Sequence, residues 1–311
     1  MPAKNLEIEL KFSLLNDKKY HLLDFLSKHC RAQFVQKKLS NTYFETRDNI
    51  LRQHDSGLRI RGFDDQFEMT LKTAALGPNG LLKREEYNYP LLEPVLDLDL
   101  FPVKVWPNSI NLSYLKENLE PQFTTDFIRT LCLIEVSTAS GITTIEVALD
   151  EGYIAAGGLR ESIYEVELEL KEGPLDGMFK FAHQLMALNC LRLSELTKAA
   201  RGYRLNHCHL NRLKPENLPL TAPASTNISH QYCFLLNKLF YLEESFLRSM
   251  LDYESFAKIL LELPTSLTST TVEIQFPIPE NAFIDQTHLN DYIFSAHYNA
   301  FKLTLLESIA A

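Results

Sequence analysis

The chain has 311 residues and a net charge of −9, with 45% hydrophobic and 23% charged residues, which is ordinary for a soluble globular protein. The acidic balance argues against a nucleic-acid partner bound through a generally basic surface, although a local basic pocket remains compatible with it. No apolar run approaches the length needed to span a bilayer, so we expect no membrane partner.

The cysteines and the N-terminus indicate the compartment. The five cysteines are odd in number, far apart and never in a CxxC pair, which is typical of reduced thiols in a cytosolic protein. The N-terminal residues lead directly into a charged strand, and no signal peptide is visible. We therefore expect a cytoplasmic location.

The first predicted strand sets a pattern that recurs along the chain. In an extended segment the side chains alternate between two faces, so Glu7, Glu9 and Lys11 share one face and two aliphatic residues share the other. Five later segments alternate in the same way, at residues 58–61, 66–72, 84–89, 144–150 and 165–171. Their charged faces carry Arg59, Arg61, Lys72, Arg84, Glu86, Glu146, Asp150, Glu165, Glu167, Glu169 and Lys171.

Helices and a linker are predicted around these strands. The helices are expected at residues 17–34, 175–189, 229–251, 253–263 and 289–309, and a short strand at 271–276. The segment 213–227 contains three prolines and is predicted to be a linker. We therefore expect a strand-rich domain at residues 1–212, the linker at 213–227 and a helical domain at 228–311.

The charged faces are compatible with two structures. An open sheet would bury the aliphatic faces and leave the charges in water, whereas a closed barrel would enclose the charges and leave the aliphatic faces to be covered by helices. The pattern favours the barrel, because three like charges on alternate residues of one strand repel each other and an ordinary surface strand does not need them. Metal ions would relieve this repulsion, and the basic faces would then meet a negatively charged ligand.

The residue types point to phosphate chemistry. Hard divalent ions take carboxylate oxygens, and Mg²⁺ commonly shares them with the phosphate oxygens of a substrate. Arginine and lysine neutralise a polyphosphate chain, and arginine can hold it with two parallel hydrogen bonds. The familiar phosphate-binding loops, GxxxxGK[ST] and GxGxxG, are absent from the sequence.

An ordered set of motifs resembles the CYTH family, the triphosphate tunnel metalloenzymes. The motifs are ExExK at 7–11, YFET at 43–46, LRIR at 58–61, Lys72, Arg84 with Glu86, Arg129, ALDEG at 148–152, ExExE at 165–169, and Lys198 with Arg201 and Gly202. The resemblance covers about residues 4–206 and is strongest to bacterial inorganic triphosphatases in which a helical CHAD domain follows the CYTH domain. It implies the fold class α+β, with a closed eight-stranded antiparallel β-barrel, helices packed outside it and a small C-terminal helical domain.

The same resemblance implies hydrolysis of tripolyphosphate to pyrophosphate and phosphate, with Mg²⁺ or Mn²⁺ as cofactor. The residues implied to bind the metal are Glu7, Glu9, Asp150, Glu167 and Glu169, and catalysis is expected to depend on Glu7, Glu9, Lys11, Glu167 and Glu169. The residues implied to bind the triphosphate are Lys11, Arg59, Arg61, Lys72, Arg84, Arg129, Lys198 and Arg201. Other acids, at Glu86, Glu146 and Glu165, are expected to hold the basic residues in place.

Three alternatives stay open at this point. Residues 228–311 are too few for a full CHAD domain, so they form either a shortened relative or an unrelated helical cap, and their apolar excess would suit a homo-oligomer or a protein partner. The substrate could be an organic triphosphate, as in class IV adenylate cyclases or thiamine triphosphatases. A non-catalytic polyphosphate or nucleotide sensor is the alternative from another class, and the complete set of acids argues against it.

Overall fold

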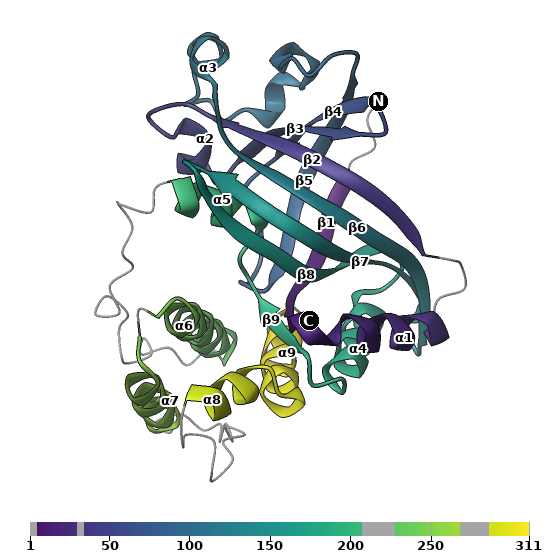
Figure 1. Cartoon of the computed structure of the whole chain (residues 1–311), viewed down its shortest axis with the longest axis vertical. Coiled ribbons are helices and arrows are strands. Elements are labelled where there is room, and N and C mark those ends of the chain that lie inside the picture. Colours follow the sequence, from purple (N-terminus) through teal and green to yellow (C-terminus); the bar gives the residue numbers. More distant parts are fainter. Residues whose placement is uncertain (1–4, 30–33, 207–227, 250, 268–285, 311) are drawn as a thin grey trace.

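The structure, a computed structural model, contains a closed antiparallel barrel and describes residues 5–29, 34–206, 228–249, 251–267 and 286–310 (Figure 1). Strands β5, β4, β3, β2, β6, β7, β8 and β1 are hydrogen-bonded in this order, and β5 also pairs with β1, which closes the ring. A ninth strand adds to β1 outside the ring. The strands are β1 (Asn5–Leu14), β2 (Val35–Glu45), β3 (Gly57–Phe63), β4 (Gln66–Lys72), β5 (Leu81–Leu91), β6 (Glu120–Thr138), β7 (Gly141–Ala156), β8 (Leu159–Glu172) and β9 (Leu191–Ser194). The predicted α+β class and eight-stranded barrel are confirmed.

The helices lie outside the ring, except for one that enters it. They are α1 (Lys19–His29), α2 (Ile50–Gln53), α3 (Leu112–Asn118), α4 (Leu175–Met186), α5 (Lys198–Asn206), α6 (Ile228–Leu247), α7 (Tyr253–Leu267), α8 (Gln286–Ile293) and α9 (Ala296–Ala310). None of the described helices combines the length and the apolar character that crossing a membrane requires. The predicted strand at 271–276 and linker at 213–227 lie outside the described residues, so the division into two domains stays a prediction.

The prediction of one helix at 289–309 is wrong, because the structure has two helices there. The first, α8, ends where the N–H of Ser295 donates to the carbonyl of Tyr292 at 2.9 Å. The Ser295 hydroxyl then accepts the N–H of Tyr298 at 3.3 Å, and Asn189 accepts the N–H of Ala296 at 2.7 Å. These side chains satisfy the first N–H groups of α9 and so favour a new helix start over a continuous helix.

The aliphatic outer face of the barrel is covered in two places. Helices α1, α4, α6 and α9 share one apolar core with the outward residues of β1, β7 and β8, including Phe12 and Val166. The segment 92–119 covers the outer face of β3 to β5, where Trp106 and Leu115 pack against Leu58. Because both outer surfaces are buried under other elements, the alternate charged residues face the interior of the barrel.

One part of the barrel interior is filled by an apolar cluster that includes α5. The rings of Tyr43 and Phe123 stack with their centroids 4.5 Å apart, and Tyr203 of α5 meets Phe123 edge-on at 4.9 Å. Helix α5 lies so close to β6 that a Cβ atom added at Gly202 would meet the Phe123 ring. This packing fixes α5 against the inner face, with Lys198 at its first turn.

Replacing Gly202 with alanine is expected to destabilise the protein by about 1–3 kcal/mol, because the added methyl group overpacks the contact with Phe123. The change would otherwise favour an α-helix by up to about 1 kcal/mol, so the sign of the effect is informative. The measurement is chemical denaturation of the full chain. The control is Gly57→Ala, since nothing lies within 4 Å of a Cβ atom built there. Equal or higher stability of Gly202→Ala would contradict the close packing of α5.

Candidate active site in the barrel interior

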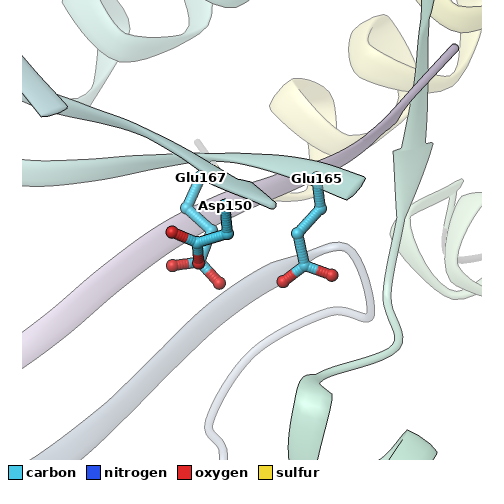
Figure 2. Close-up of side chains that lie close together, drawn as sticks. All are labelled: Asp150, Glu165 and Glu167. Carbon is cyan, nitrogen blue, oxygen red and sulfur yellow. The ribbon is translucent and has the colours of Figure 1, made fainter. Parts of the chain in front are cut away.

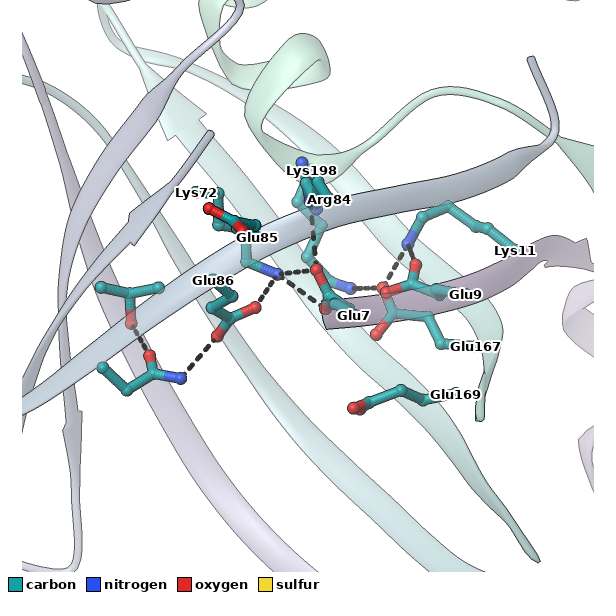
Figure 3. Close-up of polar contacts among 12 residues, drawn as sticks. Glu7, Glu9, Lys11, Lys72, Arg84, Glu85, Glu86, Glu167, Glu169 and Lys198 are labelled. Atoms are coloured by element: carbon teal, nitrogen blue, oxygen red, sulfur yellow. Dashed lines mark hydrogen bonds and ion pairs between the residues drawn. The ribbon is translucent and has the colours of Figure 1, made fainter. Parts of the chain in front are cut away.

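A polar cavity of about 790 Å³ occupies the barrel interior, and every one of the eight barrel strands contributes to its lining. Most of the residues that the sequence predicts for the site lie on this lining, and Figure 3 shows several of them pointing toward one another. They are Glu7, Glu9, Lys11, Arg59, Arg61, Lys72, Arg84, Arg129, Glu167, Glu169 and Lys198. Asp150 and Arg201 do not line the cavity.

Three glutamates form a row across three neighbouring strands, which we call the acid row. Glu9 of β1 lies opposite Glu169 of β8, and Glu169 lies opposite Glu146 of β7. Side chains in such register have Cβ atoms about 4.5–5.5 Å apart, and like charges in this position repel. Burial, Glu167 and Glu7 raise the pKa of Glu9 to about 7, although Lys11 lies 3.2 Å away. Burial also raises the pKa of Glu169.

The wall formed by β1, β4 and β5 carries paired charges. Lys72 Nζ lies 2.8 Å from Glu7 Oε1 and 2.7 Å from Glu86 Oε2, and Arg84 Nε lies 3.1 Å from Glu7 Oε2. Burial alone would raise the pKa of both glutamates, but Lys72 and a second cation beside each acid, Arg84 for Glu7 and Arg59 for Glu86, together keep both pKa values below their usual range. Glu7 and Glu86 are therefore charged at neutral pH, and their ion pairs hold Lys72 and Arg84 in place.

Two arginines on β3, which we call the arginine pair, are short of acceptors. Arg61 donates from Nε to Asn41 Oδ1 at 3.0 Å and has no carboxylate within ion-pair distance among the described residues. Burial, Arg59 and Arg129 lower the pKa of Arg61 to about 10. Arg59 lies 3.9 Å from Glu86, and its buried Nε has no hydrogen-bond partner in the part of the chain that the structure describes. The arginine pair therefore has donors ready for an anion.

A buried charge cluster joins α5 to β6, β7 and β8. Lys198 Nζ lies 2.5 Å from Asp150, 2.5 Å from Glu165 and 2.9 Å from Glu167, and Figure 2 shows these three carboxylates. Arg129 donates two hydrogen bonds of 2.7 Å to Asp150 and also contacts Glu167. Asp150 thus supports two cations of the lining from behind it.

The chain offers two sets of acids for a divalent cation. Carboxylate oxygens of Asp150, Glu165 and Glu167 lie within 4.8 Å of one another, but the Lys198 ammonium group already forms an ion pair with each of them. The acid row has fewer cations: Lys11 lies beside Glu9, and Lys171 lies 2.8 Å from Glu169 and 3.6 Å from Glu146. Because a hard cation takes oxygen ligands and would remove the repulsion in this row, the acid row fits Mg²⁺ or Mn²⁺ better than the cluster around Lys198. Glu7 and Glu167 lie beside this row on β1 and β8.

Arg201 lies behind the lining and contacts acids there. Its Nε lies 2.7 Å from Glu161 and its Nη1 lies 3.0 Å from Glu165, and it also contacts the carbonyl of Ser162. Glu161 and Glu165 share the inward face of β8 with Glu167, but neither of them lines the cavity. The geometry therefore gives Arg201 a supporting position behind Glu165.

Several lining residues had no predicted role. Tyr43 lines the cavity and accepts a hydrogen bond from Arg59 at 3.4 Å, and its alternation with Asn41 along β2 could have placed it there. Arg52 lies at the cavity edge with its guanidinium 4.9 Å from the centre of the Tyr203 ring. The buried Glu45 carboxylate accepts the N–H of Arg52 at 2.8 Å and so fixes this turn. No periodic pattern signals Arg52, because α2 is a single turn.

Replacing Glu9 with glutamine is expected to stabilise the metal-free protein at pH 8. Folding raises the pKa of Glu9 from 4.5 to about 7, so between these values the folded state holds a proton that the unfolded chain has lost. Stability of the unchanged protein therefore falls as the pH rises through this window, by up to about 3 kcal/mol, and glutamine removes the loss. The measurement is denaturation in EDTA at pH 5 and pH 8.

The gain should be present at pH 8 and small at pH 5. Glu117→Gln, an exposed change outside the cavity, is the control and should show no such pH dependence. A Glu9→Gln variant with the same stability difference at both pH values would contradict the crowding of acids described above.

The chain is similar to proteins of a known family and to solved structures. A family model described as "CYTH domain" matches residues 5–203. A Haemophilus influenzae protein described as "Inorganic triphosphatase" is 36% identical over 204 residues, which are 64% of this chain and 54% of that protein. A Hippeastrum protein whose structure is described as revealing a dominant triphosphatase activity gives a TM-score of 0.47 at 20% identity, covering 63% of this chain and 95% of that one. A Pyrococcus horikoshii protein gives 0.42 at 16%, covering 64% and 99%. The chain spans about half the length of the curated relative that it matches.

Proposed function

The chain belongs to the CYTH domain family, and from this premise we propose that it hydrolyses inorganic triphosphate to pyrophosphate and phosphate inside its barrel, with Mg²⁺ or Mn²⁺ as cofactor. Triphosphates are the proposed substrate class. Among the described residues, Cys132, Cys190 and Cys233 form no disulfide, which supports a cytoplasmic location as part of the proposal. A second copy or a protein partner at the C-terminal helices stays a prediction.

One observation carries the proposal: the cavity has surplus donors and surplus acids at different places. Within the described ranges of the chain, Arg59 has a buried donor without an acceptor and Arg61 has no carboxylate partner, whereas the acid row has like charges in register. A triphosphate would supply acceptors to the arginine pair, and a divalent cation held by the acids would share the other phosphate oxygens. A simple anion, without a cation, would leave the acids uncompensated.

The proposal assigns the lining residues to two roles. Glu7, Glu9, Glu167 and Glu169 would hold the cation, whose chemistry there is to neutralise phosphate charge. The basic residues assigned to the phosphate chain are Lys11, Arg59, Arg61, Lys72, Arg84, Arg129 and Lys198. Phosphoryl transfer depends mainly on positioning and electrostatic stabilisation, and this lining can provide both with side chains already fixed by ion pairs. Asp150 and Arg201 are proposed to act through the residues that they support.

The test of the proposal is phosphate release from tripolyphosphate, ATP and thiamine triphosphate, each with Mg²⁺, Mn²⁺ or EDTA. We expect release from tripolyphosphate that requires a divalent cation and exceeds release from the two organic substrates. If ATP or thiamine triphosphate were hydrolysed faster than tripolyphosphate, the proposed substrate would be wrong and an organic triphosphate would take its place. If no phosphate were released from any of the three substrates while tripolyphosphate still raised the melting temperature, the protein would be a binding module.

Arg61→Gln is expected to lower kcat/KM for tripolyphosphate by about 10- to 100-fold, because a hydrogen bond to a charged group contributes about 1.5–3 kcal/mol. The loss should appear largely in KM, since the arginine would bind the phosphate chain in both ground and transition states. The control is Arg160→Gln, an exposed arginine that does not line the cavity.

Glu9→Gln and Glu167→Gln are each expected to abolish turnover at saturating substrate, because both remove a proposed ligand of the cation. The same phosphate-release assay checks this, with a titration of Mn²⁺ for each variant. Unchanged rates in both variants would refute the proposed site.

A further inference from the structure

Strand β9 occupies the last open stretch of one edge of β1. On this edge, β5 pairs with β1 from Asn5 to Leu10, and β9 pairs with it from Lys11 to Leu14. Ser194 of β9 lies directly opposite Lys11, which lines the cavity. All four residues of β9 are buried. A strand of four residues held along one edge is a weak element by itself.

The other edge of β9 is completed by two side chains of α9. Asn299 accepts the backbone N–H of Leu193 at 3.0 Å, and Lys302 donates to the carbonyl of Leu193 at 3.1 Å. These two groups would be paired with a neighbouring strand in a wider sheet, and buried backbone groups need a partner. Helix α9 therefore takes the place of the missing strand, as its position beside β9 in Figure 1 shows.

A buried charge network ties the same strand to α6. Lys302 and Glu243 are fully buried and lie 2.7 Å apart, and Glu243 also accepts a hydrogen bond of 2.7 Å from Tyr298. Arg192 of β9 lies 2.8 Å from Glu243 and 2.9 Å from Glu244. Removing one member of such a network leaves an uncompensated buried charge, so the network favours one relative position of β9, α6 and α9.

The chain runs from β9 into the cavity within three residues. Thr197 caps α5, with its hydroxyl accepting the N–H of Ala200 at 3.1 Å, and Lys198 follows at once. Three residues span at most about 11 Å, and here the chain is fixed at both ends. A connection this short couples the position of β9 to the start of α5, where Lys198 lies.

We propose that Asn299 and Lys302 are positioning residues for Lys198, so that the C-terminal helices complete the active site without touching the substrate. The proposal rests on the proposed triphosphatase function for its kinetic consequence. Its structural part, the control of β9 and α5 by α9, does not depend on the reaction. In this proposal α9 holds the backbone of β9 in place. Strand β9 in turn sets the position from which Lys198 reaches Glu165 and Glu167.

The first experiment measures amide hydrogen exchange in the full chain. Lys302→Met and the milder Asn299→Leu are expected to accelerate exchange at residues 191–206 by about tenfold and to leave β4 unchanged. The matched controls are Lys258→Met on α7 and Thr304→Val on α9, both exposed, and the Thr304 hydroxyl donates within its own helix to the carbonyl of Ala300. Unchanged exchange at 191–206 in both variants, or equal acceleration in β4, would overturn the proposal.

The second experiment is a double-mutant cycle on kcat/KM for tripolyphosphate. Lys302→Met is expected to lower kcat/KM about tenfold in the unchanged protein and to have no further effect when Lys198 is already alanine. Equal effects in both backgrounds would mean that Lys302 acts through general stability, and the proposal would fail. If the unchanged protein did not hydrolyse tripolyphosphate, the proposed function alone would be refuted. The same cycle would then be measured on tripolyphosphate affinity, with the same expected outcome.

Discussion

Compensation of charges inside a closed barrel is the constraint on which the structure depends. Nine basic and eight acidic side chains line the cavity, although the whole chain has a net charge of −9. A buried charge without a partner is costly, and an ion pair repays its desolvation only when its geometry is good. The pairs of Lys72 with Glu7 and Glu86, and of Lys198 with the acids behind it, meet this condition. The remaining imbalance is concentrated at the acid row and the arginine pair.

This distribution separates residues that bear on ligand binding from those that keep the lining in place. Asp150 and Glu165 lie beneath the cavity and fix Arg129 and Lys198, so the lining cations are held in one arrangement before any ligand enters. Binding then costs little additional side-chain ordering, which favours affinity and positioning. The acid row has the opposite character: its like charges lower the stability of the barrel, and it is the place proposed for the cation. Such a trade between stability and activity is common in functional sites.

The alternation of charged and aliphatic residues predicted the barrel and which side chains face its interior, because the period of a strand is fixed by backbone geometry. It could not predict the acid row, which depends on how β1, β7 and β8 are aligned across the sheet. Arg201 was expected on the lining with Lys198, but α5 packs against the inner wall and directs Arg201 to Glu161. The network around Glu243 joins residues more than fifty positions apart and has no local pattern. Sequence periodicity therefore predicts which face of a strand a side chain lies on, whereas polar contacts between residues far apart in the chain become visible only in the folded structure.

The closure of the barrel through β1 has a consequence for the order of folding. The first strand of the chain pairs with β5 on one edge and with β8 on the other, and Lys11 lies opposite Glu167, 156 positions later in the chain. Contacts between such distant residues form slowly, because a long loop must close before any pairing rewards it. During synthesis, Glu9 and Lys11 would leave the ribosome long before β8 and β9 exist. The apolar outer face of β1 would stay exposed for that time and would be a point at which chaperones could bind the nascent chain.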